Sequence, residues 1–535
     1  MSDPRAPSGP GSPGGPVGSG GSPAPRGPDR PVERLPTGVN GLDDIAMGGL
    51  PAGRPTLVTG TTGSGKTLLA IEFLARGILC FGQPGVFVTI EETAEEIRRN
   101  ALSLGFDIRA WETEGRWVFV DASADVSDDV PTVGGYDLSA LMARIEHAVH
   151  QSDATRVSFD AFGTIFSRFR DTGVIRHELV RIVAALKTLG VTLLLTSERT
   201  HEYDGLSRYA VEEFVLDNVI VLRNVLRDER RRRTVEIVKF RGLPHRTGEW
   251  LFTIDRREGF VVIPLGITGS QRQASHTRVS TGNRGLDRMV GGGLFKDAIA
   301  MLTGPSGAGK TLIALQFAGV ASGEDERCLF CTFDETRGQL IRNAASWGLG
   351  LEAMEAANRL RVTADRPEAA SPEEHFLRLR HAVEDFAPTR VVIDTLSSLE
   401  RVVSARSLLD FVLALTAVFR AREITTLITT ASTGQGLPGG TLAGAVEMAA
   451  VSDVAITLRY VERTGDIQRA VAVLQARGSP HDPAIRQVII DGAGLHIGEP
   501  LPRVAHLLSG SAALTEHPPW PTEPECSGLD APDGP

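Results

Sequence analysis

The octapeptide GTTGSGKT at residues 60–67 recurs in the same chain as GPSGAGKT at residues 304–311. The offset between the two lysines, 310 − 66 = 244, also superimposes the preceding segments. Solenoid repeats have periods of only about 20 to 50 residues, so this longer period indicates two whole domains in tandem. The matched residues outside the loops include Thr37, Gly38, Gly41, Leu42 and Asp43, which align with Thr281, Gly282, Gly285, Leu286 and Asp287.

Composition supports two domains of ordinary size. The 535 residues are 41% hydrophobic and 23% charged, which is enough for two substantial cores. The first 30 residues are dominated by Gly, Pro and Ser, a composition typical of disorder. We therefore expect a disordered arm at 1–30, a first domain at 31–267, a linker at 268–280, a second domain at 281–497, and a C-terminal segment with a loose tail at 498–535.

Each repeat reads as a strand, a glycine-rich loop and a helix, followed by further alternation of strands and helices. In the first repeat, Thr56–Val58 precede the loop and Leu68–Leu74 follow it. Short β-rich runs continue at 191–195, 219–222 and 235–238. This alternation predicts an α/β fold in each repeat, with a mostly parallel sheet covered by helices.

The two loops have the residue pattern of the P-loop, which binds nucleotide phosphates. Glycines allow successive backbone N–H groups to surround phosphate oxygens, and the helix N-terminus adds positive potential. Lys66 and Lys310 are expected to reach the β and γ phosphates, and Thr67 and Thr311 to ligate Mg²⁺. The cofactors predicted are ATP and Mg²⁺. The predicted binding residues are Gly60, Thr61, Thr62, Gly63, Ser64, Gly65, Lys66 and Thr67, and Gly304, Pro305, Ser306, Gly307, Ala308, Gly309, Lys310 and Thr311.

A P-loop also needs a carboxylate on a neighbouring strand to hold the metal shell. Each repeat contains an apolar strand that ends in aspartate, at Asp160 in RVSFD and at Asp394 in RVVID. An aspartate in this position is often only a cap or turn residue. Its pairing with a P-loop favours a magnesium role.

Hydrolysis requires a group that orients or deprotonates water, and another strand in each repeat is followed by two acids. These are Glu91 and Glu92 in the first repeat and Asp334 and Glu335 in the second. We predict that they are catalytic. The alternative is that they begin the next helix, where acids stabilise the positive end of the dipole.

Charge, cysteine content and hydropathy exclude several other classes. The formal net charge of −10 argues against indiscriminate nucleic-acid binding as the main role. Cys328 and Cys331 form a CxxC in an apolar run, which we interpret as buried thiols and not as a metal site. No apolar run approaches the roughly 18 residues that cross a bilayer, so we expect no membrane association and a cytoplasmic location.

From about Leu35 to Leu508 the chain resembles the KaiC family of cyanobacterial clock ATPases, which have two RecA-like domains. The resemblance implies a homohexameric double ring with ATP between neighbouring subunits, an ATPase in the first ring and a Ser/Thr autokinase in the second. It also implies a KaiB-like or signalling-protein partner. The motifs that carry it, besides both P-loops, are GVFVTIEET (85–93), VGGYDLSAL (133–141), YAVEEFVLDNVIVLRNVL (209–226), ERRRRTVEIVKFRG (229–242), RNAASWG (342–348) and LLSGS (507–511).

In such rings a neighbouring subunit supplies cations to the γ-phosphate. By resemblance, Lys239, Arg241 and His245 in KFRGLPH have this role, although a solvated hairpin face is the alternative. The second repeat has QARGSPH, which retains Arg477 and His481 but has Gln475 in place of the lysine.

The chain departs from the family where the phosphoacceptors are expected. Counting back from Asp453, the Ser-Thr pair of the family corresponds to Ala449 and Ala450, so an acceptor would have to move to Thr441 or Ser452. Asp334 replaces a glutamate base, and its side chain is one methylene shorter. Residues 515–535 match the family's partner-binding tail poorly. We expect nucleotide binding to be kept and autophosphorylation to be altered or lost.

Three functions remain open at this point. The first is a KaiC-like ATPase that switches signalling or partner binding. The second is a RecA-like DNA-dependent ATPase or recombinase, suggested by the basic run Arg230–Arg233, which we assign instead to a surface or subunit interface. In the third, hydrolysis is confined to the first ring and the second is a nucleotide-bound scaffold.

Overall fold

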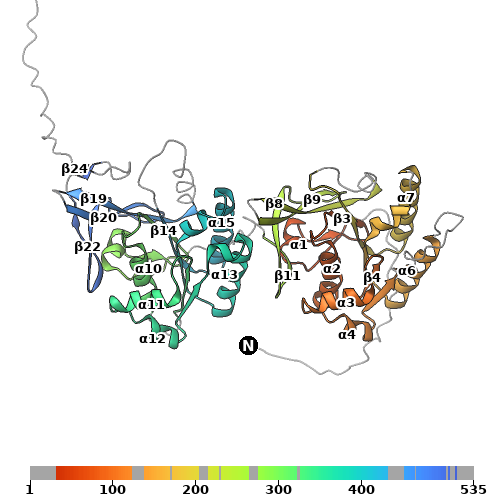
Figure 1. Cartoon of the computed structure of the whole chain (residues 1–535), viewed down its shortest axis with the longest axis horizontal. Coiled ribbons are helices and arrows are strands. Elements are labelled where there is room, and N and C mark those ends of the chain that lie inside the picture. Colours follow the sequence, from red (N-terminus) through yellow and green to blue (C-terminus); the bar gives the residue numbers. More distant parts are fainter. Residues whose placement is uncertain are drawn as a thin grey trace, which may run out of the picture.

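In the computed structural model the chain forms two α/β domains that lie side by side, each built around one nine-stranded sheet (Figure 1). This confirms the fold class predicted from the repeat. In the described part of the chain, no helix is both long and apolar enough to cross a membrane. The structure describes residues 32–122, 138–168, 172–203, 215–227, 230–263, 275–321, 326–431, 451–463, 466–501, 504–505 and 513–514.

The first sheet has the strand order β11-β10-β9-β8-β3-β7-β6-β4-β5. Strands β8, β3, β7, β6, β4 and β5 are parallel, and β9, β10 and β11 extend the sheet by antiparallel pairing. Its strands are β3 (Pro55–Gly60), β4 (Gly85–Thr89), β5 (Trp117–Asp121), β6 (Arg156–Asp160), β7 (Thr192–Glu198), β8 (Asn218–Arg227), β9 (Arg230–Phe240), β10 (Glu249–Asp255) and β11 (Gly259–Val262).

Helices cover both faces of this sheet, and an apolar cluster fills the space on each side. Residues from α1 to α4 pack on one face, whereas residues from α6 and α7 pack on the other. A short two-stranded sheet of β1 (Arg34–Leu35) and β2 (Leu50–Pro51) precedes the main sheet. The helices are α1 (Leu42–Ile45), α2 (Lys66–Phe81), α3 (Ala94–Leu102), α4 (Ile108–Thr113), α6 (Leu138–Ser152), a 3₁₀ helix (Phe162–Arg168) and α7 (Thr172–Thr188).

The second sheet repeats this topology strand for strand, in the order β16-β15-β17-β18-β14-β19-β20-β21-β22. Its strands are β14 (Ile299–Gly304), β15 (Cys328–Thr332), β16 (Leu360–Ala364), β17 (Arg390–Asp394), β18 (Thr425–Ala431), β19 (Val454–Arg463), β20 (Asp466–Ala476), β21 (Arg486–Asp491) and β22 (Gly494–Pro500). The short strands are β12 (Arg278–Val279), β13 (Leu294–Phe295), β23 (Val504–Ala505) and β24 (Ala513–Leu514).

The helices of the second domain also divide between the two faces of its sheet. Residues of α9 to α12 pack on one face, and residues of α13, α14 and α15 pack on the other. These helices are α9 (Arg284–Met289), α10 (Lys310–Gly319), α11 (Arg337–Ser346), α12 (Leu351–Ala356), a 3₁₀ helix (Pro367–Ala369), α13 (Pro372–Phe386), α14 (Leu396–Glu400) and α15 (Ala405–Ala421).

The aligned residues ahead of the P-loops build the same turn in both domains. Asp43 Oδ1 accepts hydrogen bonds from the backbone nitrogen and the hydroxyl of Thr37, at 2.8 and 2.7 Å. Asp287 Oδ1 accepts the same two from Thr281, both at 2.7 Å. The repeated sequence is therefore explained by local hydrogen bonding as well as by the nucleotide site.

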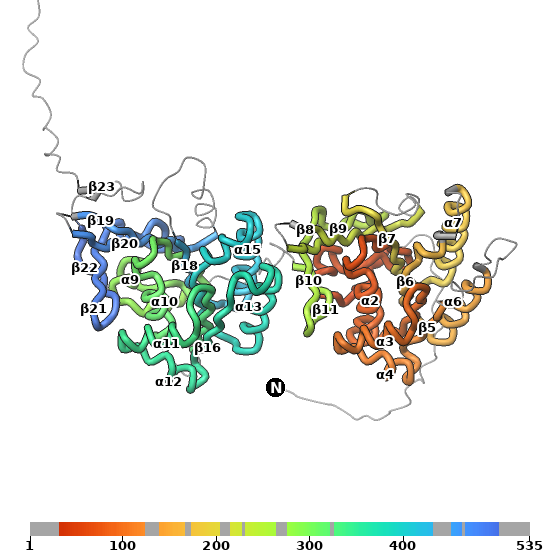
Figure 2. The backbone as a smooth tube through the Cα atoms, viewed as in Figure 1, coloured from red at the N-terminus to blue at the C-terminus, as the bar shows by residue number. Residues whose placement is uncertain are grey.

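The two domains meet where the β10–β11 edge of the first sheet packs against the second domain. Val261 and Ile263 belong to the same buried cluster as residues of α13 and α15. Figure 2 shows the backbone of β10 and β11 lying beside that of α13. The edge of one sheet is therefore covered by helices of the other domain, so that its apolar side chains are removed from water.

Candidate functional site

Each P-loop joins the central strand of its sheet to a helix that begins at the lysine. The first runs from Gly60, at the end of β3, to Lys66 at the start of α2. Gly63 and Gly65 have φ values of 74° and 97°, and Gly307 and Gly309 of the second loop have 74° and 108°. Glycine adopts this left-handed backbone without steric cost, so the loops turn in the same way.

The lysines fold over their own loops. Lys66 Nζ donates to the carbonyl oxygens of Gly60 and Thr61, both at 3.0 Å. Lys310 Nζ donates to Gly304 and Pro305, at 2.8 and 2.9 Å. Burial of the ammonium group lowers the pKa of both lysines from the usual value. Each ammonium group is therefore held at the loop where phosphate oxygens are expected.

The predicted magnesium residues lie together in both domains. Thr67 Oγ1 donates to Asp160 Oδ2 at 2.8 Å, and Thr311 Oγ1 donates to Asp394 Oδ2 at 2.9 Å. The second oxygen of each carboxylate accepts from a threonine on the adjacent strand, Thr196 or Thr429. A hydroxyl and a carboxylate, both hard oxygen ligands, suit Mg²⁺.

Both aspartates are almost fully buried. Asp160 and Asp394 are 6% and 3% exposed, and this desolvation is the largest effect raising the pKa of each carboxyl group. A bound cation would offset the cost of burying their charge. The residues present therefore fit a divalent cation beside the nucleotide.

In the first domain the acid pair lies between β4 and α3. Glu91 accepts a hydrogen bond from Thr164 Oγ1, and Glu92 Oε2 accepts one from Asn100 Nδ2 at 3.0 Å. Burial, followed by the nearby charge of Asp160, raises the pKa of Glu92. The N-cap of α3 is Thr93, which forms a capping box with Glu96. Helix α3 begins at Ala94, so Glu91 and Glu92 precede it and are not part of its first turn.

In the acid pair of the second domain, Glu335 makes the same contact as Glu92 of the first domain, whereas Asp334 makes contacts that differ from those of Glu91. Glu335 Oε2 accepts from Asn343 Nδ2 at 3.1 Å, as Glu92 does from its asparagine, and burial raises the pKa of Glu335. Asp334 Oδ1 instead accepts from Ser398 Oγ at 2.8 Å and forms an ion pair with Arg401 at 3.1 Å. Thr336 caps α11. The first acid of this pair is therefore engaged by a cation of its own domain.

Two carboxylates near the first P-loop were missed by sequence reasoning. Thr61 Oγ1 donates to Glu202, Thr62 Oγ1 donates to Glu198 at 3.4 Å, and both acids act electrostatically on Lys66. Glu198 ends β7, where it pairs with Gly60, whereas Ala431 occupies the matching position opposite Gly304. The sequence signal that could have identified Glu198 is an acid at the end of the β-rich run 192–197, as at Asp160. More carboxylates therefore act on Lys66 in the first site than on Lys310 in the second.

The predicted transfer cations lie at the opposite end of the sheet from their own P-loop. Lys239 pairs with Val219, which pairs with Leu57 near the start of β3, while the P-loop follows the end of that strand. Arg241 Nη1 forms an ion pair with Asp217 at 3.2 Å. In the second domain Arg477 is equally placed, since its backbone nitrogen donates to Asp453 O at 2.8 Å, ahead of β19. These residues are too far along the strands to serve the P-loop of their own domain.

The expected phosphoacceptor positions Ala449 and Ala450, and the alternative Thr441, lie outside the described residues. The other alternative, Ser452, is described and is fully buried, with an exposed fraction of 0%. Its carbonyl oxygen accepts a hydrogen bond from Gln475 Nε2 at 3.4 Å. A buried hydroxyl in this position is not accessible to a phosphoryl donor.

Two other sequence features have structural roles. Arg230 donates to the carbonyl oxygens of Glu368 and Ala370, so the basic run contacts the second domain of the same chain. Cys328 and Cys331 belong to separate buried clusters on the two faces of the second sheet. Desolvation raises the pKa of both thiols, that of Cys331 to about 12. These cysteines cannot share a metal ion.

The duplicated sheet, the P-loops and their paired aspartates define the class: a tandem P-loop ATPase with two RecA-like domains. The family model described as "ATPase: KaiC" matches residues 35–266 and 279–501. The chain therefore belongs to the KaiC family.

Three curated relatives are circadian clock proteins of similar length. The chain is 46% identical to circadian clock protein KaiC3 of Synechocystis sp., with 90% of this chain and 95% of the relative covered. It is 44% identical to the circadian clock oscillator protein KaiC of Synechococcus elongatus, over 90% and 92%. The same oscillator protein of Prochlorococcus marinus is 40% identical, over 90% and 95%.

Proposed function

We propose that the protein is a nucleotide-dependent switch that hydrolyses Mg-ATP at its first P-loop. Mg-ATP binding is supported by the Thr67–Asp160 pair next to Lys66, whose Nζ donates to Thr61 O in the loop. The second domain repeats this pair, so the observation that carries hydrolysis at the first loop is its acid pair, of which the second-domain counterpart Asp334 is paired with Arg401. When bound, Mg²⁺ would neutralise phosphate charge. Lys66 would leave the loop carbonyls and donate to phosphate oxygens, and Asp160 and Thr67 would hold the cation.

Glu91 and Glu92 would act on the attacking water. Thr164 and Asn100 restrain the two carboxylates, so that they are oriented before the substrate arrives. The raised pKa of Glu92 makes it a stronger base than an ordinary glutamate. The acid pair therefore supplies the water-activating group that the P-loop lacks.

The chain would assemble as a homohexamer in which the cations of one subunit face the nucleotide of the next. The support is geometric: Lys239 and Arg241 lie at the end of the sheet remote from their own P-loop. In a head-to-tail ring, this remote end meets the loop of a neighbouring subunit. An arginine supplied in this way stabilises the charge of the transition state.

The second P-loop would bind Mg-ATP mainly to hold the assembly together. Asp334 is paired with Arg401, and Gln475 stands where the first domain has a lysine. Ala449 and Ala450 have no hydroxyl group to receive phosphate. We infer that autokinase activity at these positions is lost, and that the nucleotide state is read by a KaiB-like or other signalling protein.

The test compares Lys66→Ala and Lys310→Ala in the full chain with Mg-ATP. ADP release, intact mass with peptide mapping, and ring size by light scattering would be measured on the same samples. We expect Lys66→Ala to abolish turnover and Lys310→Ala mainly to weaken assembly, with no added phosphate in either sample. Equal loss of turnover in both variants would refute the division of roles, and phosphate on the wild-type chain would refute loss of the kinase.

The DNA-dependent alternative has less support. Arg230 and Arg232 are occupied by contacts with the second domain and are not free to bind a phosphate backbone. Salt-sensitive DNA binding with DNA-stimulated ADP release would nevertheless favour it over the switch.

A further inference from the structure

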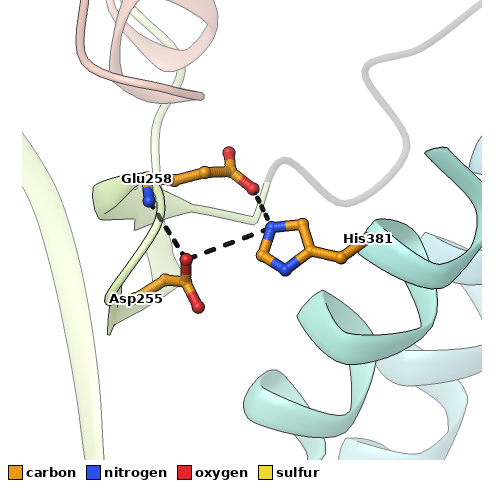
Figure 3. Close-up of side chains that lie close together, drawn as sticks. All are labelled: Asp255, Glu258 and His381. Carbon is orange, nitrogen blue, oxygen red and sulfur yellow. Dashed lines mark hydrogen bonds and ion pairs between the residues drawn. The ribbon is translucent and has the colours of Figure 1, made fainter. Parts of the chain in front are cut away.

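A group of side chains of types that ligate metals lies where the two domains meet, outside both P-loops. Asp255 ends β10, Glu258 lies just before β11, and His381 projects from α13 of the second domain (Figure 3). One ligand atom from each lies within 4.8 Å of the others. His381 Nε2 contacts Glu258 Oε1 and lies 4.0 Å from Asp255 Oδ1.

Other contacts hold the two carboxylates in place. Asp255 Oδ1 accepts hydrogen bonds from the backbone nitrogens of Arg257 and Glu258, at 2.7 and 3.0 Å. Glu258 Oε2 accepts one from Asn40 Nδ2 at 2.6 Å, so that Oε1 is directed toward His381. Outer partners of this kind orient the ligands of metal sites.

The cluster is partly buried but still reachable by water. The side chains of His381, Glu258 and Asp255 are 12%, 19% and 21% exposed. Charges at this depth interact more strongly than on an open surface. An ion bound here could complete its coordination with water.

The charges around the cluster leave room for a cation. Two guanidinium groups contact Glu258: Arg380 Nη2 contacts its Oε1, and Arg76 Nη2 donates to its backbone oxygen at 2.6 Å. Arg76 is also paired with an acid outside the cluster, since its Nε lies 3.5 Å from Glu72 Oε2. Arg380 has a second acid nearby, since its Nε lies 3.9 Å from Glu384 Oε1. Arg380 can therefore remain paired with Glu384 when a metal ion replaces it as the partner of Glu258. Arg257 does not compete, as it forms hydrogen bonds with both oxygens of Asp385.

We propose that Asp255, Glu258 and His381 bind a divalent transition-metal ion of the zinc type, which joins the two domains. One imidazole nitrogen and two carboxylate oxygens are ligands that Zn²⁺ and Co²⁺ accept, with a further position for water. Ca²⁺ and Mg²⁺ prefer oxygen ligands alone. The inference is independent of the proposed hydrolysis. Because ligands come from both domains, the ion stabilises their contact.

The test is metal binding by the untagged full chain in excess Mg²⁺. Zn²⁺ bound at equilibrium dialysis would be counted per chain, and Co²⁺ would be followed by its visible spectrum. We expect one saturable site per chain, and at least about tenfold weaker binding in His381→Ala. The matched control is His496→Ala, which removes a histidine that pairs with Asp491 at 3.3 Å but has no third ligand among the residues that the structure describes.

Folding of each variant is checked by circular dichroism and by ADP release. If His381→Ala does not fold, Glu258→Gln and Asp255→Asn take its place, because they keep side-chain size while weakening the ligand. Equal Zn²⁺ content in wild type, the cluster variants and His496→Ala would overturn the proposal. So would a wild-type chain that binds no Zn²⁺ in excess Mg²⁺, or one whose site Ca²⁺ fills equally well.

Discussion

Glu72 is a buried acid on α2, and replacing it with glutamine should stabilise the protein in a pH-dependent way. The side chain is 0% exposed, and Oε1 accepts the backbone N–H of Phe260 on β11. Burial raises the pKa of this carboxyl group from 4.5 to about 7, although the Phe260 hydrogen bond and Arg76 oppose the rise. The folded state therefore holds the proton more tightly than the unfolded chain does.

The direction of the effect follows from this difference. The contribution of Glu72 to stability is fully present below about pH 4.5 and is lost as the pH rises to about 7. Each pKa unit is worth about 1.4 kcal/mol, so the ionised side chain costs the folded state roughly 3 kcal/mol. Glu72→Gln keeps an oxygen for the Phe260 N–H but carries no charge. Its advantage over wild type should grow from under about 1 kcal/mol near pH 5 to roughly 3 near pH 8.

The assay is urea unfolding of wild type and Glu72→Gln across this pH range. Glu114→Gln is the control, because it removes the charge of an exposed glutamate. A second variant, Glu72→Ala, should be less stable than Glu72→Gln at every pH, since it leaves the Phe260 N–H without an acceptor. A stability difference between Glu72→Gln and wild type that does not change with pH would refute the reasoning.

Gly259→Ala should destabilise the protein by more than about 1 kcal/mol, because φ is +75° and the new Cβ would lie 2.0 Å from Glu72 Oε1. Gly82→Ala, at φ +64° with open space around it, should cost less in the same urea unfolding assay. Thr93→Ala should cost about 1 kcal/mol in urea unfolding, because it removes the N-cap of α3, and Thr93→Ser should restore most of it. Arg232→Ala should cost roughly 3 kcal/mol in that assay, because Glu373, 6% exposed, loses its ion-pair partner; an unchanged midpoint would contradict this.

The sequence predicted those parts of the fold and site that depend on short segments. The P-loops and the strands that end in Asp160 and Asp394 are local patterns, and the structure brings each aspartate to its P-loop threonine. The 244-residue offset predicted the duplicated fold because it aligns residues that make the same turn, such as Thr37 and Thr281.

The rest depends on which strands and domains become neighbours. Glu198 reaches the first loop only because β7 lies next to β3, and Arg401 reaches Asp334 across 67 residues of chain. The basic run at 230–233 is expected at a surface or subunit interface; Arg231 is exposed, and Arg230 contacts the second domain of its own chain. Such pairings depend on strand order and domain docking, which residue type and spacing do not encode.

The shared apolar cluster at the domain boundary has a consequence for work with fragments. Val261 and Ile263 of the first domain are 0% and 3% exposed, and they pack in one buried cluster with residues of α13 and α15. In a fragment that ends after β11, both side chains would face solvent, at a cost of about 1.5 to 3 kcal/mol each. Such a fragment would expose an unprotected edge strand, which promotes aggregation. Measurements of solubility, oligomeric size and turnover on such a fragment would then be affected by the newly exposed apolar surface as well as by the first domain itself.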